Sequence, residues 1–139
     1  LEMYKKLDNS TELSIVGHPT GLKKSQDPRI NYVGYVNNVS DLINIYDNHN
    51  IFILPSFTEA HPQVLYESLA RMRPVIIFGE INHVIKNQEG IFASKRNTRS
   101  LSDTIKFVMD NYVNISESIK KNKLPMKQEF ISQMCKILD

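Results

Sequence analysis

The sequence has little cysteine, no long apolar run and no excess of charge of one sign. Its only cysteine is Cys135, which excludes an internal disulfide and indicates a reducing, cytoplasmic compartment. No stretch approaches the ~20 apolar residues that a membrane-crossing helix needs, and no signal-peptide pattern is visible. The net charge of +2, with acids and bases mixed along the chain, gives no reason to expect nucleic acid as a partner. The four histidines have no metal-ligand spacing, so no metal site is indicated either.

The composition and the order of apolar runs predict a folded α/β domain. The chain has 139 residues, of which 41% are hydrophobic and 23% are charged, as in soluble globular proteins. Short apolar runs alternate with amphipathic stretches, which favours a Rossmann-like, mostly parallel sheet with helices on both faces. No second core or internal repeat is visible, so residues 1–139 are interpreted as a single domain. Strands are predicted at residues 13–17, 30–33, 51–54, 74–78 and 90–93, and helices at 40–48, 62–72, 100–112, 115–122 and 126–138.

Particular residues are expected at the ends and on the inner faces of these elements. Ser40 and either Ser100 or Ser102 are expected to cap the helices that follow them. Pro62 suits the first position of its helix, where no N–H group is needed. The run 51–54 is apolar without alternation, so both faces of that strand are expected to be buried. The helix that follows Pro62 is expected to turn four residues inward: Val64, Leu65, Leu69 and Met72.

Loops at the carboxyl ends of parallel strands commonly bind ligands. The most informative of these loops carries Glu59, and Glu67 lies on the next helix, where it shares a face with Gln63. The start of that helix has free N–H groups that attract an anion, and carboxylates accept hydrogen bonds from sugar hydroxyls. A ligand with phosphate in the middle and hydroxyls at both ends is a sugar nucleotide. The alternative is that the spacing is a coincidence and Glu67 is a solvated helix residue.

The order of motifs along the chain resembles that of a known enzyme family. The segment from Pro55 to Ala70, PSFTEAHPQVLYESLA, resembles the E-x7-E segment of retaining glycosyltransferases with the GT-B fold, of the group 1 or family 4 type. The resemblance runs in order over roughly residues 5–112, and it implies one half of a GT-B fold, the half that binds the nucleotide-sugar donor. The other matching segments are Leu13–Gly17 (the family's L-x-I-V-G), Val33–Val36 (F-x-G-x-V), Arg73–Ile76 (G-x-P-V-I) and Glu89–Phe92 (N-G-x-L).

The family's roles can be placed on the matching positions. Glu59 would hold hydroxyls of the donor sugar at the catalytic centre, and Glu67 would hold the ribose. Backbone N–H groups near Gln63 and Val64 would meet the diphosphate. The resemblance implies a nucleoside diphosphate sugar as donor, with a UDP-sugar expected first, and no metal or other cofactor. The complete donor site that it implies consists of Gly17, Gly34, Tyr35, Val36, Glu59, His61, Gln63, Val64 and Glu67.

The remaining members of that donor site have smaller roles. Tyr35 and Val36, which follow Gly34, would lie beside the nucleotide base. Gly17 would let the chain pass close to the donor. His61 would touch a phosphate or a sugar, or else only shape its loop.

Some positions depart from the family's pattern. Ala60 and Arg73 stand where glycine is usual, and residues 79–82 replace a common pair of glycines. These differences bear on the sugar pocket more than on the fold. At Arg73, the end of the preceding helix is expected to be strained or to differ in shape.

The resemblance also implies parts that this sequence does not contain. They are the first strand of the domain, with an arginine and a lysine for the diphosphate, and the N-terminal acceptor-binding domain. The chain alone is therefore expected to bind the donor weakly and to transfer little. The implied whole protein transfers a hexose to a glycan, lipid or other acceptor, in the cytoplasm or at the inner face of the membrane. Peripheral membrane attachment through Lys120, Lys121 and Lys123 is the alternative to a solvated basic face.

Two other functions stay open at this point. A nucleotide-sugar epimerase shares the GT-B architecture and would use Glu59, Glu67 or His61 as acid and base. A non-catalytic α/β interaction module would use none of them. His83 is interpreted as a surface residue and Tyr66 as a packing residue. The base, the sugar, the acceptor and the oligomeric state are not specified by the sequence.

Overall fold

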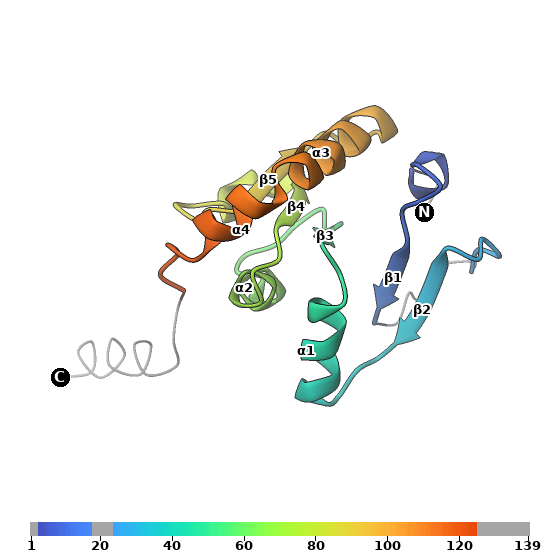
Figure 1. The fold of residues 1–139 in the computed structure, drawn as a ribbon, viewed down its shortest axis with the longest axis horizontal. Coiled ribbons are helices and arrows are strands. Elements are labelled where there is room, and N and C mark those ends of the chain that lie inside the picture. The colour runs from blue at the N-terminus through green and yellow to red at the C-terminus, as the bar shows by residue number, and fades with distance from the viewer. Residues whose placement is uncertain (1–2, 18–23, 125–139) are drawn as a thin grey trace.

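The computed structural model describes residues 3–17 and 24–124, so the predicted helix at 126–138 and Cys135 lie outside the described residues. Two short 3-10 helices, η1 (Tyr4–Lys6) and η2 (Gly79–Val84), precede β1 and follow β4. The five strands and four α-helices predicted within the described residues are confirmed, with ends that differ by up to three residues. They are β1 (Leu13–Val16), β2 (Ile30–Gly34), α1 (Val39–Asp47), β3 (Phe52–Leu54), α2 (Gln63–Ala70), β4 (Val75–Phe78), β5 (Ile91–Ser94), α3 (Thr98–Asp110) and α4 (Tyr112–Ile119) (Figure 1).

The strands form parallel sheets flanked by helices, as the sequence predicts. β1 pairs with β2, and β4 lies between β3 and β5. In the larger sheet, Val75 is in register with Phe52 on one side and with Ile91 on the other. Among the described residues, however, β1 and β3 each pair with one strand only. The single sheet that the sequence suggests is therefore divided into two.

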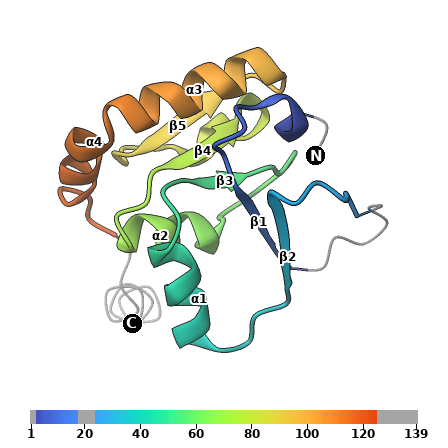
Figure 2. The same cartoon turned by 45° about the vertical axis from the view of Figure 1, so that its right-hand side comes forward.

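Strand β4 is the centre of the main core, because all four of its residues are buried. Side chains alternate between the two faces of a strand. Val75 and Ile77 pack in one cluster with residues of α2. Ile76 and Phe78 pack in another cluster with Leu101 of α3. Figure 2 shows the result, with α3 on one side of the three-stranded sheet and α2 on the other.

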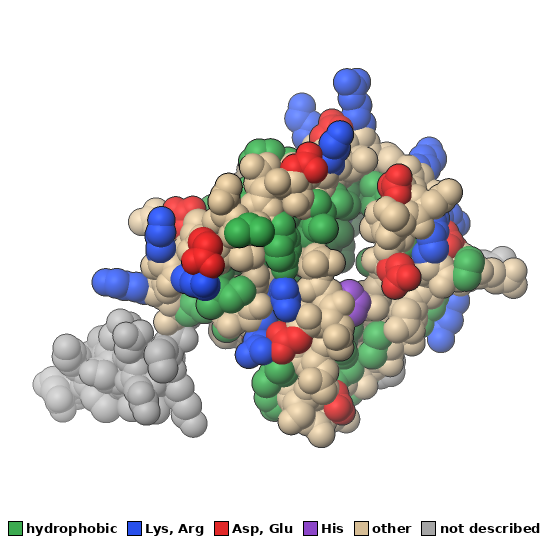
Figure 3. All heavy atoms as spheres, in the orientation of Figure 1, with side chains coloured by type: hydrophobic (Ala, Val, Ile, Leu, Met, Phe, Trp, Pro, Cys, Tyr) green, Lys and Arg blue, Asp and Glu red, His purple; other side chains and the backbone are tan. Residues whose placement is uncertain are grey.

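Strand β3 is less buried than the sequence predicts. Leu54 is buried, but Phe52 and Ile53 are only half-buried. The reason is that the edge of β3 that faces away from β4 has no partner strand in the described part of the chain, whereas β4 is covered along both edges. The space-filling view shows an opening at this place, between the part that contains β3 and the part that contains β1 and β2 (Figure 3).

The smaller sheet is joined to the rest of the molecule by side chains. Residues of η1 and β2, including Ile30, form a small buried cluster. Ile105 of α3 packs against this cluster and also against the cluster of Phe78. His49, which follows α1, makes a 2.8 Å hydrogen bond between its Nε2 and the Oγ of Ser14 in β1. Packing and one polar contact thus hold the two sheets together at this place.

The caps of two helices differ from the predicted ones. Asn38 caps α1 in place of Ser40, whose backbone N–H donates to the Asn38 side chain at 2.8 Å. Asn97 caps α3 in place of Ser100 or Ser102, and its side chain accepts from the backbone N–H of Ser100 at 2.9 Å. Asparagine is at least as good an N-cap as serine, and here it stands earlier in the chain. Each helix therefore begins before the predicted cap.

Helix α2 begins and ends inside its predicted limits. Pro62 is its N-cap, with extended backbone, and is not its first helical residue. Leu65 and Leu69 are fully buried as predicted, but Val64 is 37% and Met72 36% exposed, so the prediction that these two face inward is wrong. Val64 lies in the first turn, beside the buried stripe, and Met72 lies beyond the end of the helix.

The backbone strain expected at Arg73, after the end of α2, is found at the preceding residue. Met72 has the left-handed φ of 58°, so the strained position is one residue before Arg73. Arg73 is held by carbonyl groups at the end of α1, since its Nε donates to Tyr46 O at 3.0 Å and its Nη2 to Asp47 O at 2.9 Å. A glycine at position 73 would lose these bonds.

We expect Met72→Gly to raise the free energy of unfolding by about 0.5–1 kcal/mol, because glycine adopts a left-handed φ without steric cost. Ala70→Gly, on an exposed helical residue two positions earlier, is the control and should lower it by about 1 kcal/mol. Urea unfolding of the three proteins measures both. A Met72→Gly protein no more stable than the original would contradict the assignment of strain to this residue.

Candidate functional site

The loops at the carboxyl ends of β1 and β2 meet through their glycines. Gly17 and Gly34 have positive φ angles of 103° and 80°, and the Gly17 N–H donates to Gly34 O at 2.7 Å. Within the described part of the chain, a Cβ atom built on either glycine would meet nothing within 4 Å, so among these residues the space next to this stretch of backbone is open. Tyr35 is exposed and Val36 is half-buried just beyond it. Four predicted donor-site residues are therefore brought together here, beside open space.

The loop between β3 and α2 has a defined conformation around Glu59. The Ser56 hydroxyl donates to Oε1 of Glu59 at 2.6 Å. The backbone carbonyl of Glu59 is 2.6 Å from Nε2 of His83, which lies in η2. His83 is exposed, as the sequence predicts, and its ring in addition holds the backbone of Glu59, the predicted catalytic residue. His61 stacks on Tyr66, with ring centroids 5.0 Å apart.

A second contact to this loop was not expected from the sequence. Arg96, which follows β5, donates from Nη1 to Pro55 O at 3.2 Å and from Nη2 to Ser56 O at 2.9 Å. Its Nε forms an ion pair with Glu80 at 3.0 Å. The hydrogen bond from Arg96 holds the pKa of the Glu80 carboxyl below its usual value. The only signal for Arg96 in the sequence is that a cationic residue follows the carboxyl end of a predicted strand.

The first turn of α2 presents backbone donors. Pro62 has no side-chain acceptor, and the turn contains no acidic residue. The first intrahelical bond runs from Leu65 N to Pro62 O at 3.2 Å. The N–H groups of Gln63 and Val64 precede that bond, and both residues are exposed. A helix start of this kind suits an anion, because the helix dipole and unpaired N–H groups both favour negative charge.

Glu67 lies one turn after this helix start. It is exposed, and its Oε2 accepts a 3.3 Å hydrogen bond from the hydroxyl of Tyr46, which also lies 3.3 Å from Val64 O. Tyr46 is buried in α1 against Phe52, with ring centroids 5.9 Å apart. Burial, reinforced by the nearby Glu67 carboxylate, raises the pKa of Tyr46. The sequence predicts that Tyr46 is buried on the inner face of its helix, which the structure confirms, but it does not predict the contact of its hydroxyl with Glu67.

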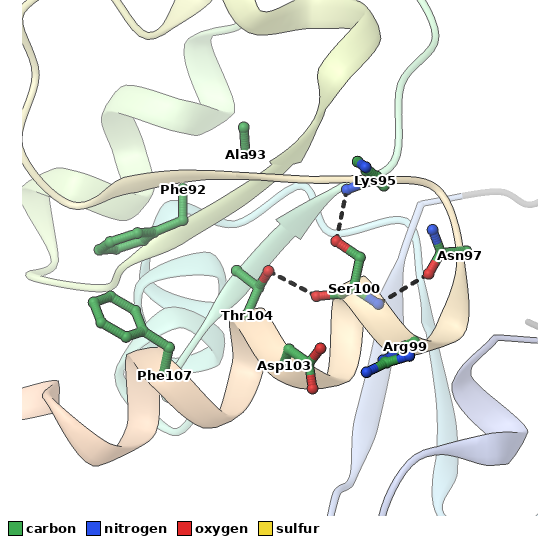
Figure 4. A pocket seen from close by; sticks show the side chains of 9 residues that line it. All are labelled: Phe92, Ala93, Lys95, Asn97, Arg99, Ser100, Asp103, Thr104 and Phe107. Atoms are coloured by element: carbon green, nitrogen blue, oxygen red, sulfur yellow. Dashed lines mark hydrogen bonds between the residues drawn. The ribbon is translucent and has the colours of Figure 1, made fainter.

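An open hollow of about 550 Å³ lies elsewhere, between β5 and α3 (Figure 4). None of the nine predicted donor-site residues lines it. The Ser100 hydroxyl accepts from Lys95 N at 3.0 Å, and the Asn97 side chain caps α3. The hydroxyl of Ser100 and the side chain of Asn97, which line the hollow, are thus bonded within the protein and stabilise the start of α3. The hollow is not the site that the sequence predicts.

The comparison with protein families agrees with the order of these elements. A model of the family described as "Glycosyl transferases group 1" matches residues 1–111. The chain belongs to the group 1 glycosyl transferases. The match covers β1 to β5 and α3, and so includes every loop described above.

Two curated relatives resemble the chain at low identity. An N,N'-diacetylbacillosaminyl-diphospho-undecaprenol alpha-1,3-N-acetylgalactosaminyltransferase of Campylobacter jejuni is 23% identical in an alignment of 107 residues that covers 73% of this chain and 28% of the relative. The capsular polysaccharide biosynthesis glycosyltransferase CapM of Staphylococcus aureus is 26% identical over 138 residues, which are 96% of this chain and 33% of the relative. The chain spans about a third or less of the length of these relatives.

We expect Tyr46→Phe to lower the free energy of unfolding by about 1 kcal/mol at pH 8, through loss of the hydroxyl contacts. Folding raises the pKa of Tyr46, so its contribution is complete below the unfolded pKa of about 10 and is lost as the pH rises toward the folded value. The gap between the wild type and the variant should therefore narrow between pH 10 and pH 11. Urea unfolding at pH 8, 9, 10 and 11 measures it. A gap that stays constant over this range would contradict the assignment.

Proposed function

We propose that this chain is the donor-binding part of a retaining hexosyltransferase that uses a nucleoside diphosphate sugar. The observation that carries the proposal is the arrangement around α2. Glu59 lies in the loop before the helix, the helix begins without a side-chain cap, and Glu67 is exposed one turn later next to Tyr46. A diphosphate at the helix start would have a carboxylate toward its sugar and another toward its ribose.

The chemistry of these groups fits the proposed donor. Carboxylates accept hydrogen bonds from vicinal hydroxyls, so Glu59 would orient the hexose and Glu67 the ribose. When the glycosidic bond to phosphate breaks, negative charge develops on the leaving diphosphate. The N–H groups of Gln63 and Val64 would stabilise that charge, with no metal required. We propose a UDP-sugar as the first donor to test, with the base beside Tyr35 and Val36, Gly17 close to the donor and His61 near the sugar.

The setting of the whole protein is also a proposal. The named relatives act on an undecaprenol-linked sugar and in capsular polysaccharide biosynthesis. We propose that this protein likewise builds a cell-envelope glycan on the cytoplasmic side of the membrane, with its acceptor bound by a separate N-terminal domain. No helix in residues 3–17 and 24–124 is long and apolar enough to cross a membrane.

We also propose that a further strand lies between β1 and β3 in the whole protein. Both strands have an edge without a strand partner in the described ranges, and an opening lies between them (Figure 3). Leu13 N donates to Arg29 O, toward β2, and Phe52 N donates to Pro74 O, toward β4. Since successive amides of a strand point to opposite sides, the amides of Ser14 and Ile53 point toward the opening. One parallel strand would pair with both.

Hydrogen exchange tests this further strand. In the 139-residue chain, we expect the amide of Ile53 to exchange much faster than that of Phe52, because only the latter is bonded within a sheet. For the same reason, we expect the amide of Ser14 to exchange much faster than that of Leu13. In the full-length protein, both fast amides should become as protected as their neighbours. Fast exchange of Ser14 and Ile53 in the full-length protein would contradict the proposal.

Binding of nucleotides to the labelled chain tests the donor site directly. UDP, GDP, ADP and their glucose, galactose and mannose conjugates are titrated, and amide chemical shifts are followed by NMR. We expect saturable shifts at residues 34–36 and 63–67 with the nucleotides of one base. Absence of shifts in this chain and in the full-length protein would favour a non-catalytic interaction module.

Two variants separate the roles of the carboxylates. We expect Glu67→Ala to weaken nucleotide binding by about 1.5–3 kcal/mol, because a charged hydrogen-bond acceptor is lost. Glu59→Ala should weaken sugar-nucleotide binding and leave binding of the free nucleotide unchanged. Glu117→Ala, on the exposed face of α4, is the control. Equal losses for both ligands with Glu59→Ala would contradict the assigned role.

A further inference from the structure

The loop that carries Glu59 is held at both ends by side chains from later parts of the chain. At its start, Arg96 donates to the carbonyl groups of Pro55 and Ser56. At its end, His83 bonds the carbonyl group of Glu59 at 2.6 Å. Only two residues, Phe57 and Thr58, lie between these attachments. The backbone that leads to Glu59 is therefore fixed before any ligand binds.

Arg96 is itself placed by two aromatic rings and a carboxylate. Its guanidinium carbon lies 4.2 Å from the ring centroid of Phe78, which is fully buried, and 3.9 Å from that of Phe57, which is 70% exposed. Its Nε and Nη2 both donate to the carboxylate of Glu80. The planar, delocalised guanidinium suits this combination of ring stacking and fork-shaped hydrogen bonding, which the ammonium group of lysine does not reproduce.

A short path of hydrogen bonds leads from Arg96 to the Glu59 carboxylate. Nη2 of Arg96 donates to Ser56 O at 2.9 Å, and the Ser56 hydroxyl donates to Glu59 Oε1 at 2.6 Å. Ser56 thus accepts a hydrogen bond from the guanidinium with its carbonyl group and donates one to the Glu59 carboxylate with its hydroxyl. Four of the five N–H donors of the guanidinium are engaged with Glu80 and the two carbonyl groups, so most of its hydrogen-bonding capacity is used within the protein.

We propose that Arg96 is a positioning residue for the donor sugar: it holds the β3–α2 loop so that Glu59 points at the sugar hydroxyls. This inference rests on the proposed donor-binding function. Positioning of this kind matters because a carboxylate that is ordered in advance loses less entropy when the sugar binds. Arg96 therefore contributes to binding of the sugar through Glu59. It does not contribute to binding of the free nucleotide.

The first experiment needs no ligand. Amide hydrogen exchange and chemical shifts of residues 56–61 are compared in the wild-type chain, Arg96→Ala, Arg96→Lys and the control Arg99→Ala, an exposed arginine of α3. We expect faster exchange and shifted amides in both Arg96 variants, to a lesser degree for lysine, and wild-type behaviour in the control. Thermal unfolding shows whether each variant is folded. An unchanged loop in folded Arg96→Ala overturns the proposal, whatever the chain binds.

The second experiment measures affinities for UDP and UDP-glucose. Arg96→Ala should weaken UDP-glucose by about tenfold and UDP by less than about twofold. Equal weakening of both ligands overturns the proposal, since it indicates direct contact with the nucleotide or general destabilisation. If the wild-type chain binds neither ligand, the proposed function fails for these ligands, and the hydrogen-exchange result alone decides whether Arg96 positions Glu59.

A double-mutant cycle then tests the path through Glu59. If Arg96 acts through that carboxylate, Glu59→Ala combined with Arg96→Ala should bind UDP-glucose no more weakly than Glu59→Ala alone. Losses that add in the double variant overturn the proposed path. Glu80→Gln, which keeps the shape of the side chain that holds Arg96 but removes its charge, should give a smaller loss than Arg96→Ala in the same direction.

Discussion

Parallel pairing along both edges of β4 determines where the functional groups of this domain meet. The registers Leu54 with Ile77 and Phe78 with Ser94 bring the carboxyl ends of β3, β4 and β5 to one edge of the sheet. The β3–α2 loop, η2 and the segment before α3 all begin there. The backbone hydrogen bonds between the strands thus bring these three segments together, although the segments are far apart in the sequence. The functional side chains take no part in those strand-pairing bonds.

The same pairing brings to the Glu59 loop the side chains of Arg96 and His83 that hold its backbone. Burial of Phe78 is worth about 1.5–3 kcal/mol and fixes the ring on which the guanidinium of Arg96 rests. The ring of Phe57, which is largely exposed, also lies against the guanidinium, so this surface aromatic residue contacts a cation. The buried Phe78 therefore positions Arg96, and Arg96 in turn positions the β3–α2 loop.

The sequence predicts the elements of this fold well because its strands are short, apolar and bounded by glycine or proline. It also predicts that Glu59 and Glu67 flank one helix start, since their spacing is local. It does not predict the contacts that Arg96, His83 and Tyr46 make with the β3–α2 loop and with α2. These contacts join residues 18 to 41 positions apart and depend on strand order. Burial of Ile53 was overestimated for a related reason, because an apolar run does not indicate whether both edges of a strand are paired.

The division of the sheet separates the two ends of the proposed donor site. Gly17 follows β1 and Gly34 ends β2, both in the smaller sheet, whereas Glu59 and Glu67 follow β3 of the larger one. Between these sheets, Ile105 and the contact of His49 with Ser14 carry the connection described above. No strand pairing joins the two sheets among the described residues, so a donor that touched both ends would bridge parts held together by side chains only. Any further ordering of the sheets on binding would cost entropy and subtract from the affinity. A strand in the opening would supply that order beforehand, because its backbone would be bonded to both sheets at once. In this domain the continuity of the sheet and the affinity for a long, two-ended ligand are therefore expected to be coupled.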